Sequence, residues 1–228
     1  AREPLSQTLR IYWKLVRDPQ LIGYALSGGF FYAGAYAFIV GTPFAYIDFH
    51  HVSPQAYGWL FGINILGMMI ANFANSRLLN LMGSERLFYR GTWLLAFTGV
   101  VLGVCAWFGW GGLWGLVVPI FFYMSMNGFI VANSVAGALA FFPQRAGSAS
   151  SLLGAMHYGS GIFSATLVSW LSDGTPKGMA LVMSGAGIGS MLAACISKST
   201  RRPLSASDSR NQKLPPLGRQ HRNEGMLE

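Results

Sequence analysis

Six long apolar stretches, separated by short polar connections, constrain this chain more than any other feature. At about 1.5 Å per residue, even the shortest would extend roughly 28 Å as a helix, close to the thickness of a bilayer's hydrocarbon core. The sequence therefore predicts an all-α membrane protein with six transmembrane helices. Because the connections are short, consecutive helices should run antiparallel. The predicted spans cover residues 21–43, 56–76, 87–108, 113–142, 148–171 and 179–197.

The composition and the placement of charge agree with a membrane protein. Hydrophobic residues make up 52% of the chain and charged residues 11%, against about 25% charged in an ordinary soluble domain. The net charge of +8 could indicate a nucleic-acid-binding protein, but Lys177 is the only one of the sixteen Lys and Arg residues on one side of the predicted bilayer. This positive-inside pattern places both termini in the cytoplasm and argues against a nucleic-acid partner.

Tryptophan supports the same topology, because indole rings favour the interface between membrane and water. Five tryptophans fall at the predicted outer ends of the second to fifth spans. They are Trp59, Trp107, Trp110, Trp114 and Trp170.

Two flanking regions differ from the predicted bundle. Residues 1–20 form a cytoplasmic linker, in which apolar residues at spacings of three and four predict a short amphipathic helix on the membrane surface. Residues 198–228 are basic and rich in Ser, Pro and Gln, so we expect a disordered cytoplasmic tail.

Glycine and proline suggest how the helices pack. Three pairs with Gly-x-x-x-Gly spacing, at 58/62, 99/103 and 185/189, predict close contacts between helices inside the bundle. Pro119 lies inside the fourth span, where it removes a backbone hydrogen bond and is expected to kink the helix.

Polar side chains at mid-membrane depth mark the candidate site, because each costs free energy without a partner or water. Asn127 is the best marker of an inward face, and His157 is the group there that could change charge near neutral pH. No Asp or Glu lies inside a predicted span. A neutral histidine bonded to a neighbouring helix, and aromatic side chains facing lipid, are the alternatives. The predicted cavity residues are Phe31, Tyr32, Tyr36, Met124, Asn127 and His157.

The connection between the fourth and fifth spans carries a specific motif. The run Phe142-Pro143-x-x-Ala146-Gly147-Ser148-Ala149-Ser150-Ser151 resembles the bicyclomycin-resistance (Bcr/CflA) drug transporters of the major facilitator superfamily. The resemblance extends from about residue 9 to residue 197. It implies that the chain is the C-terminal, six-helix half of a twelve-helix transporter, with an N-terminal half as its partner.

That resemblance also implies an activity. Members of this family are proton-driven antiporters of the bacterial inner membrane that export small organic drugs and confer antibiotic resistance. The proton carrier would lie in the N-terminal half or be His157. No cofactor, metal or catalytic residue is expected. The turn between the second and third spans departs from the superfamily's usual motif, because Asn80 stands where an Asp is common.

Two other functions compete with a transporter half. A self-sufficient six-helix channel or scaffold would fit the same spans. An intramembrane serine protease would need a nucleophilic serine in a Gly-x-Ser-Gly setting and a histidine on another helix. The nearest run, Tyr158-Gly159-Ser160-Gly161, lacks the first glycine, and His157 lies on the same helix. The sequence therefore predicts a transporter and not an enzyme.

Overall fold

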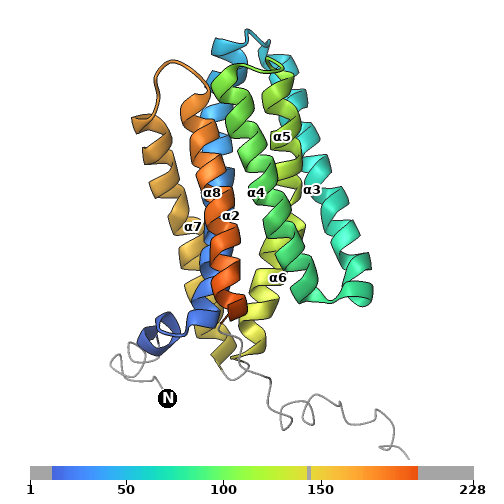
Figure 1. The fold of residues 1–228 in the computed structure, drawn as a ribbon, viewed down its shortest axis with the longest axis vertical. Coiled ribbons are helices and arrows are strands. Elements are labelled where there is room, and N and C mark those ends of the chain that lie inside the picture. The colour runs from blue at the N-terminus through green and yellow to red at the C-terminus, as the bar shows by residue number, and fades with distance from the viewer. Residues whose placement is uncertain (1–11, 143–144, 200–228) are drawn as a thin grey trace, which may run out of the picture.

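The computed structural model describes residues 12–142 and 145–199, and every regular element in those ranges is a helix (Figure 1). A short helix over residues 12–16 precedes the bundle. The helices that follow run up and down along one long axis. In order they are α2 (Pro19–Pro43), the π-helix η1 (Phe44–Phe49), α3 (Pro54–Met82), α4 (Ser84–Phe108), α5 (Trp114–Ser125), α6 (Asn127–Ala140), α7 (Ala146–Trp170) and α8 (Lys177–Ser199).

The prediction of an all-α membrane protein is confirmed, but the count of six apolar spans is not exact. Five helical segments of the described ranges are long and apolar enough to cross a membrane, judged by length and composition. Helix α7, with 25 residues, has the length but is not among them. The reason is its many serines and glycines, which lower its hydropathy. The proposed amphipathic turn before residue 12 and the basic tail after residue 199 lie outside the described residues.

Local chemistry explains where two of the helices begin. Asp18 caps α2, because its Oδ1 accepts hydrogen bonds from the backbone N–H groups of Gln20 at 3.0 Å and Leu21 at 3.1 Å. Ser53 caps α3 in the same way, with its Oγ accepting from the N–H of Ala56 at 3.3 Å. A proline at the first position of both helices costs nothing, since that N–H has no partner within a helix.

The fourth predicted span is a broken helix, and the break is not at the proline. Pro119 is buried inside α5, which continues to Ser125. The interruption lies at Met126, where the N–H of Met126 bonds to the carbonyl of Tyr123 and the N–H of Phe129 bonds to the carbonyl of Met126, both at 3.1 Å. These are three-residue bonds that tighten the chain locally. Pro119, the sixth residue of α5, lacks an N–H to donate along the helix, yet the helix continues past it.

Helix α2 lies at the centre of the bundle, where it packs against α6, α7 and α8. Helix α8 also packs against α4, and α3 packs against α5 and α6. Small hydroxyl side chains tie these helices together, as expected where lipid cannot drive association. The bonds are Ser27 and Ser190 between α2 and α8, Ser184 to the carbonyl of Gly99 between α8 and α4, and Ser164 to the carbonyl of Ala33 between α7 and α2.

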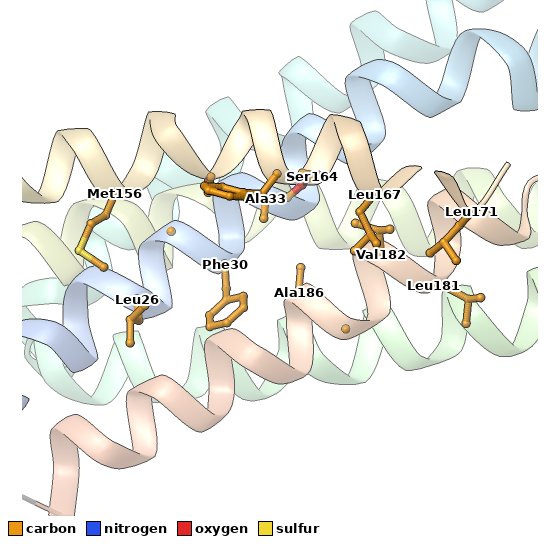
Figure 2. Close-up of a pocket in the computed structure, with 14 residues that line it drawn as sticks. Leu26, Phe30, Ala33, Met156, Ser164, Leu167, Leu171, Leu181, Val182 and Ala186 are labelled. Atoms are coloured by element: carbon orange, nitrogen blue, oxygen red, sulfur yellow. Dashed lines mark hydrogen bonds between the residues drawn. The ribbon is translucent and has the colours of Figure 1, made fainter. Parts of the chain in front are cut away.

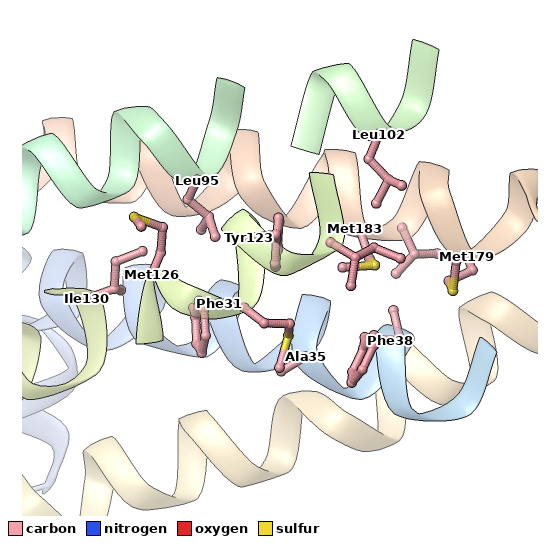
Figure 3. Packing of buried hydrophobic residues seen from close by; sticks show 14 of the residues in the cluster. Phe31, Ala35, Phe38, Leu95, Leu102, Tyr123, Met126, Ile130, Met179 and Met183 are labelled. Carbon is pink, nitrogen blue, oxygen red and sulfur yellow. The ribbon is translucent and has the colours of Figure 1, made fainter. Parts of the chain in front are cut away.

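The buried core lies between α2, α5, α4 and α8. Aromatic and methionine side chains fill much of it, and Leu95 and Leu102 of α4 close one side (Figure 3). On α2, Phe38 packs against Phe61 of α3 with ring centroids 5.2 Å apart. The core therefore holds the central helix on several sides and leaves α3 and α7 more exposed.

Not all of the Gly-x-x-x-Gly pairs lie at close contacts between helices, as their spacing predicts. Gly99 and Gly103 of α4 lie against Ser184 of α8, where an added Cβ at either position would crowd that residue. Gly58 and Gly62 of α3 have no other heavy atom within 4 Å of an added Cβ. The prediction of internal packing was therefore wrong for the α3 pair within the described chain. Spacing alone does not specify which face of a helix points inward.

The two ends of the bundle differ in their side chains. Lys177 lies at one end, where its Nζ is 5.4 Å from the ring centroid of Trp107. The tryptophans assigned to the outer ends of the spans are all exposed there. The other described Lys and Arg residues lie at or near the opposite end, where the guanidinium of Arg17 is 4.5 Å from the ring centroid of Trp13. The basic residues and the tryptophans therefore gather at opposite ends of the bundle, and which end is cytoplasmic stays a prediction.

Candidate functional site

An aromatic cluster lies where α2 crosses α7, about halfway along both helices. Tyr32 of α2 stacks on the imidazole of His157, with ring centroids 5.2 Å apart and planes 24° apart. Tyr158 of α7 and Tyr36 of α2 lie at 5.4 and 6.4 Å from the Tyr32 ring. These four residues are called the tyrosine–histidine cluster below. The cluster therefore lies halfway along two helices of 25 residues each, a length that could span a bilayer.

His157 is buried in the cluster, with 4% of its surface exposed. Its Nε2 points at Gly28 of α2, and a Cβ at that position would overlap the imidazole ring. Gly28 is therefore the residue that makes room for the histidine. Within the described residues Nε2 has no hydrogen-bond partner. Such an atom is costly in a membrane protein unless water or a ligand reaches it.

One glycine contact and one hydrogen bond fix the packing of α7 against α2. Gly161 lies against the ring of Tyr36, where an added Cβ would be 2.7 Å from the ring. One turn further, Ser164 donates a hydrogen bond to the carbonyl of Ala33. Buried residues recur along α7 every three or four positions, from Ala149 to Val168. The remaining faces of α7 are largely exposed, so Tyr158 is open on one side of the cluster.

Phe31 and Met124, both predicted to line a cavity, lie elsewhere. Phe31 is fully buried and stacks on Tyr123 of α5 with ring centroids 6.2 Å apart. Met124 is buried in the same apolar core. Neighbouring positions on α2 point about 100° apart, which explains why Phe31 faces the core while Tyr32 faces α7. Their role as substrate contacts stays a prediction.

Asn127 is the first residue of α6 and is half-buried beside the break in the fourth span. The next residue, Gly128, lies against Asn72 of α3, where an added Cβ would be 2.7 Å from the amide oxygen. A broken helix places backbone groups and a polar side chain at membrane depth, which is tolerated beside protein or a water-filled cavity. No hydrogen bond or ring contact in the described ranges joins Asn127 to the tyrosine–histidine cluster. The two are separate candidate contact points.

The motif run belongs to the start of α7. Ala146, Gly147, Ser148, Ala149 and Ser150 form its first turns, whereas Pro143 lies outside the described residues. Ala149 is fully buried, and Gly147 has open space around an added Cβ. The run therefore contributes one small buried position to the packing of this helix end.

A second polar contact joins α3 and α6. The Nδ2 of Asn133 donates to the Oδ1 of Asn75 at 2.8 Å and to the carbonyl of Phe129 at 2.9 Å. Both asparagines are buried. This pair joins α3 to α6 on the C-terminal side of the break at Met126.

The cluster combines aromatic faces, phenol hydroxyls and an imidazole. All four acidic residues of the described ranges lie at helix ends or in connections, away from this cluster. Such a set can hold flat organic molecules by stacking and by a few hydrogen bonds. Sequence reasoning missed Tyr158 and Gly28. Tyr158 is adjacent to His157, and Gly28 lies one helical turn before Tyr32, so helical periodicity was the signal that could have found Gly28.

A multi-pass, all-α membrane protein with a polar and aromatic cluster at mid-depth is the class that the fold and the site define. No protein-family model matches the chain. The chain is 27% identical over 197 residues to the bicyclomycin resistance protein homolog of Haemophilus influenzae, covering 83% of this chain and 46% of that protein. It is 33% identical over 150 residues to the uncharacterized MFS-type transporter YdgK of Bacillus subtilis, covering 66% of this chain and 37% of that protein.

These relatives confirm the resemblance to bicyclomycin-resistance transporters of the major facilitator superfamily. The chain is thus a homologue of MFS-type transporters, which are not enzymes. It spans less than half the length of the curated relatives it matches.

Proposed function

We propose that this chain is the six-helix, C-terminal part of a proton-coupled exporter of small organic drugs, of the kind to which bicyclomycin belongs. In this proposal it works in the bacterial inner membrane with both ends in the cytoplasm, beside an N-terminal half of six further helices. The name of the Haemophilus influenzae relative supports the substrate class. The asymmetry of basic residues and tryptophan supports the orientation.

The observation that carries the proposal is the tyrosine–histidine cluster halfway along α2 and α7. A drug of this class would stack on Tyr32 or Tyr36 and receive a hydrogen bond from a phenol hydroxyl or from the amide of Asn127. A transporter binds its substrate near the middle of the membrane, between two halves that move against each other. The open side of Tyr158 is where the second half would meet the cluster.

Energy coupling in this proposal uses a group outside the chain. His157 is stacked on Tyr32 and closely confined by Gly28, contacts that suit a residue that positions the tyrosine ring. The described membrane helices carry acidic residues only at their ends. The proton carrier would therefore lie in the N-terminal half, and His157 would position Tyr32.

Drug accumulation tests this function directly. The gene product that carries this chain is expressed in a bacterial strain without its own drug exporters, and intracellular bicyclomycin is measured. Tyr36→Leu and Asn127→Leu should each reduce export about fivefold, the effect of losing one hydrogen bond or ring contact. Asn80→Leu, an exposed asparagine in the last turns of α3, is the matched control. Unchanged export in both test variants, at equal expression, would refute the assignment of the site.

A further inference from the structure

A groove on the outside of the bundle lies apart from the tyrosine–histidine cluster. It runs between α7 and α8 with α2 as its floor, and its volume is 410 Å³ (Figure 2). Along α7 the lining extends from Met156 to Leu171, which corresponds to about 22 Å of helix. On α2 it is lined by Phe30 and Ala33, on a different face of the helix from Tyr32.

The lining offers no free hydrogen-bond donor to a ligand. Ser160 and Ser164 are the polar side chains in it. The hydroxyl of Ser160 donates to the carbonyl of His157 at 2.6 Å, and that of Ser164 donates to the carbonyl of Ala33. All other lining side chains are hydrocarbon, thioether or glycine. A ligand with polar groups would lose its water here without compensation, so the groove suits hydrocarbon alone.

Small residues make up part of the lining of the groove. These are Gly29 and Ala33 of α2 and Gly185 and Ala186 of α8, while α2 also contributes the larger Leu26 and Phe30. An added Cβ at Gly185 would have no other heavy atom within 4 Å, so this glycine faces open space. A long trough lined by hydrocarbon along its whole length fits an extended, unbranched chain better than a flat ring system.

The rim of the groove lies on the apolar surface that the membrane covers. Phe163 is 79% exposed, and Leu167 and Leu181 at the rim are exposed as well. At this depth the surrounding medium contains no water, so a laterally open groove is filled by whatever hydrocarbon lies next to it.

We propose that this groove, called the acyl groove below, binds one acyl chain of a bilayer phospholipid. The bound chain would fill the space between α7 and α8, which make few direct contacts with each other and both pack on α2. The acyl chain would thereby pack between α7 and α8 and stabilise the position of α7 on the bundle. The proposal does not depend on whether the chain exports drugs.

Photo-labelling tests the acyl groove. The protein is reconstituted in vesicles of phosphatidylethanolamine and phosphatidylglycerol, in which part of the phosphatidylglycerol carries a diazirine on one acyl chain. After illumination, adducts are mapped by mass spectrometry. They should concentrate on Leu167, Val182 and their neighbours, well above the level on Phe97, an exposed residue of α4 outside the groove.

A substitution series at Gly185 makes the test specific. Gly185→Phe places a ring in the open space of the groove. If the ring displaces about two methylenes of the bound chain, labelling should fall roughly tenfold. Gly185→Leu should give a smaller loss and serves if the Phe variant does not fold. Gly62→Phe is the matched control, because it also enters open space but lies on α3, away from the groove.

Three results would overturn the proposal. Equal labelling of the groove and of Phe97 would mean ordinary contact with surrounding lipid. An unlabelled groove in the folded protein would mean that protein covers it. Loss of the groove adducts on addition of bicyclomycin, with the lipid unchanged, would assign the groove to the transported molecule.

Discussion

The contact between α2 and α8 yields a quantitative prediction, because its two hydrogen bonds are not equivalent. Ser190 Oγ lies 2.9 Å from the carbonyl oxygen of Ser27 and 2.9 Å from Ser27 Oγ. A hydroxyl has one proton, and Ser190 uses it on the carbonyl. The hydroxyl of Ser27 must therefore donate to the hydroxyl oxygen of Ser190. The side chain of Ser190 thus takes part in both bonds, and that of Ser27 in only one.

The two alanine variants should consequently differ about twofold. Ser27→Ala removes one bond, whereas Ser190→Ala removes both. With a typical value of about 0.6 kcal/mol for a hydrogen bond between membrane helices, the losses in unfolding free energy should be about 0.6 and about 1.2 kcal/mol. The double variant should be no less stable than Ser190→Ala, because no further bond remains to be lost.

Reversible unfolding of the purified protein in mixed micelles, with increasing sodium dodecyl sulfate, measures these free energies. Ser134→Ala is a control of matched burial, because that hydroxyl bonds only to the carbonyl of Val131 in its own helix. It should stay close to the parent stability. Equal losses for Ser27→Ala and Ser190→Ala, or additive losses in the double variant, would refute the assignment of donors.

Three further predictions concern coupling, topology and packing. Export by His157→Gln should keep its dependence on the proton gradient; survival of downhill exchange alone would make His157 the coupling group. In a cysteine-free background, Gln55→Cys and Ser172→Cys should react with an impermeant maleimide added to intact cells, and Asn80→Cys should not, whereas the reverse pattern would invert the topology. Gly103→Leu should lower the unfolding free energy by about 1–3 kcal/mol, because the larger side chain overpacks the contact between α4 and α8; an unchanged denaturation midpoint would contradict that contact.

The sequence by itself determined the class of protein, and its distribution of charge predicts an orientation in the membrane. Long apolar stretches leave helices as the way to satisfy backbone hydrogen bonds in lipid, and this constraint acts on each stretch separately. The exception was α7, in which serines and glycines reduce hydropathy although the helix has full length. A strongly apolar sequence is not needed where a helix packs through small residues, such as Ala149 and Gly161.

The tertiary structure decided which residues meet. His157 was singled out because of its depth, but its neighbours Gly28 and Tyr32 come from another helix and depend on how α7 is rotated. Phe31 and Tyr32 are adjacent in sequence yet face the core and α7 respectively. Inside lipid an apolar residue is acceptable on every face of a helix, so hydropathy does not define the inward face. The inward face is defined by close packing of small residues and by hydroxyl hydrogen bonds between helices. Both form only when the helices are assembled.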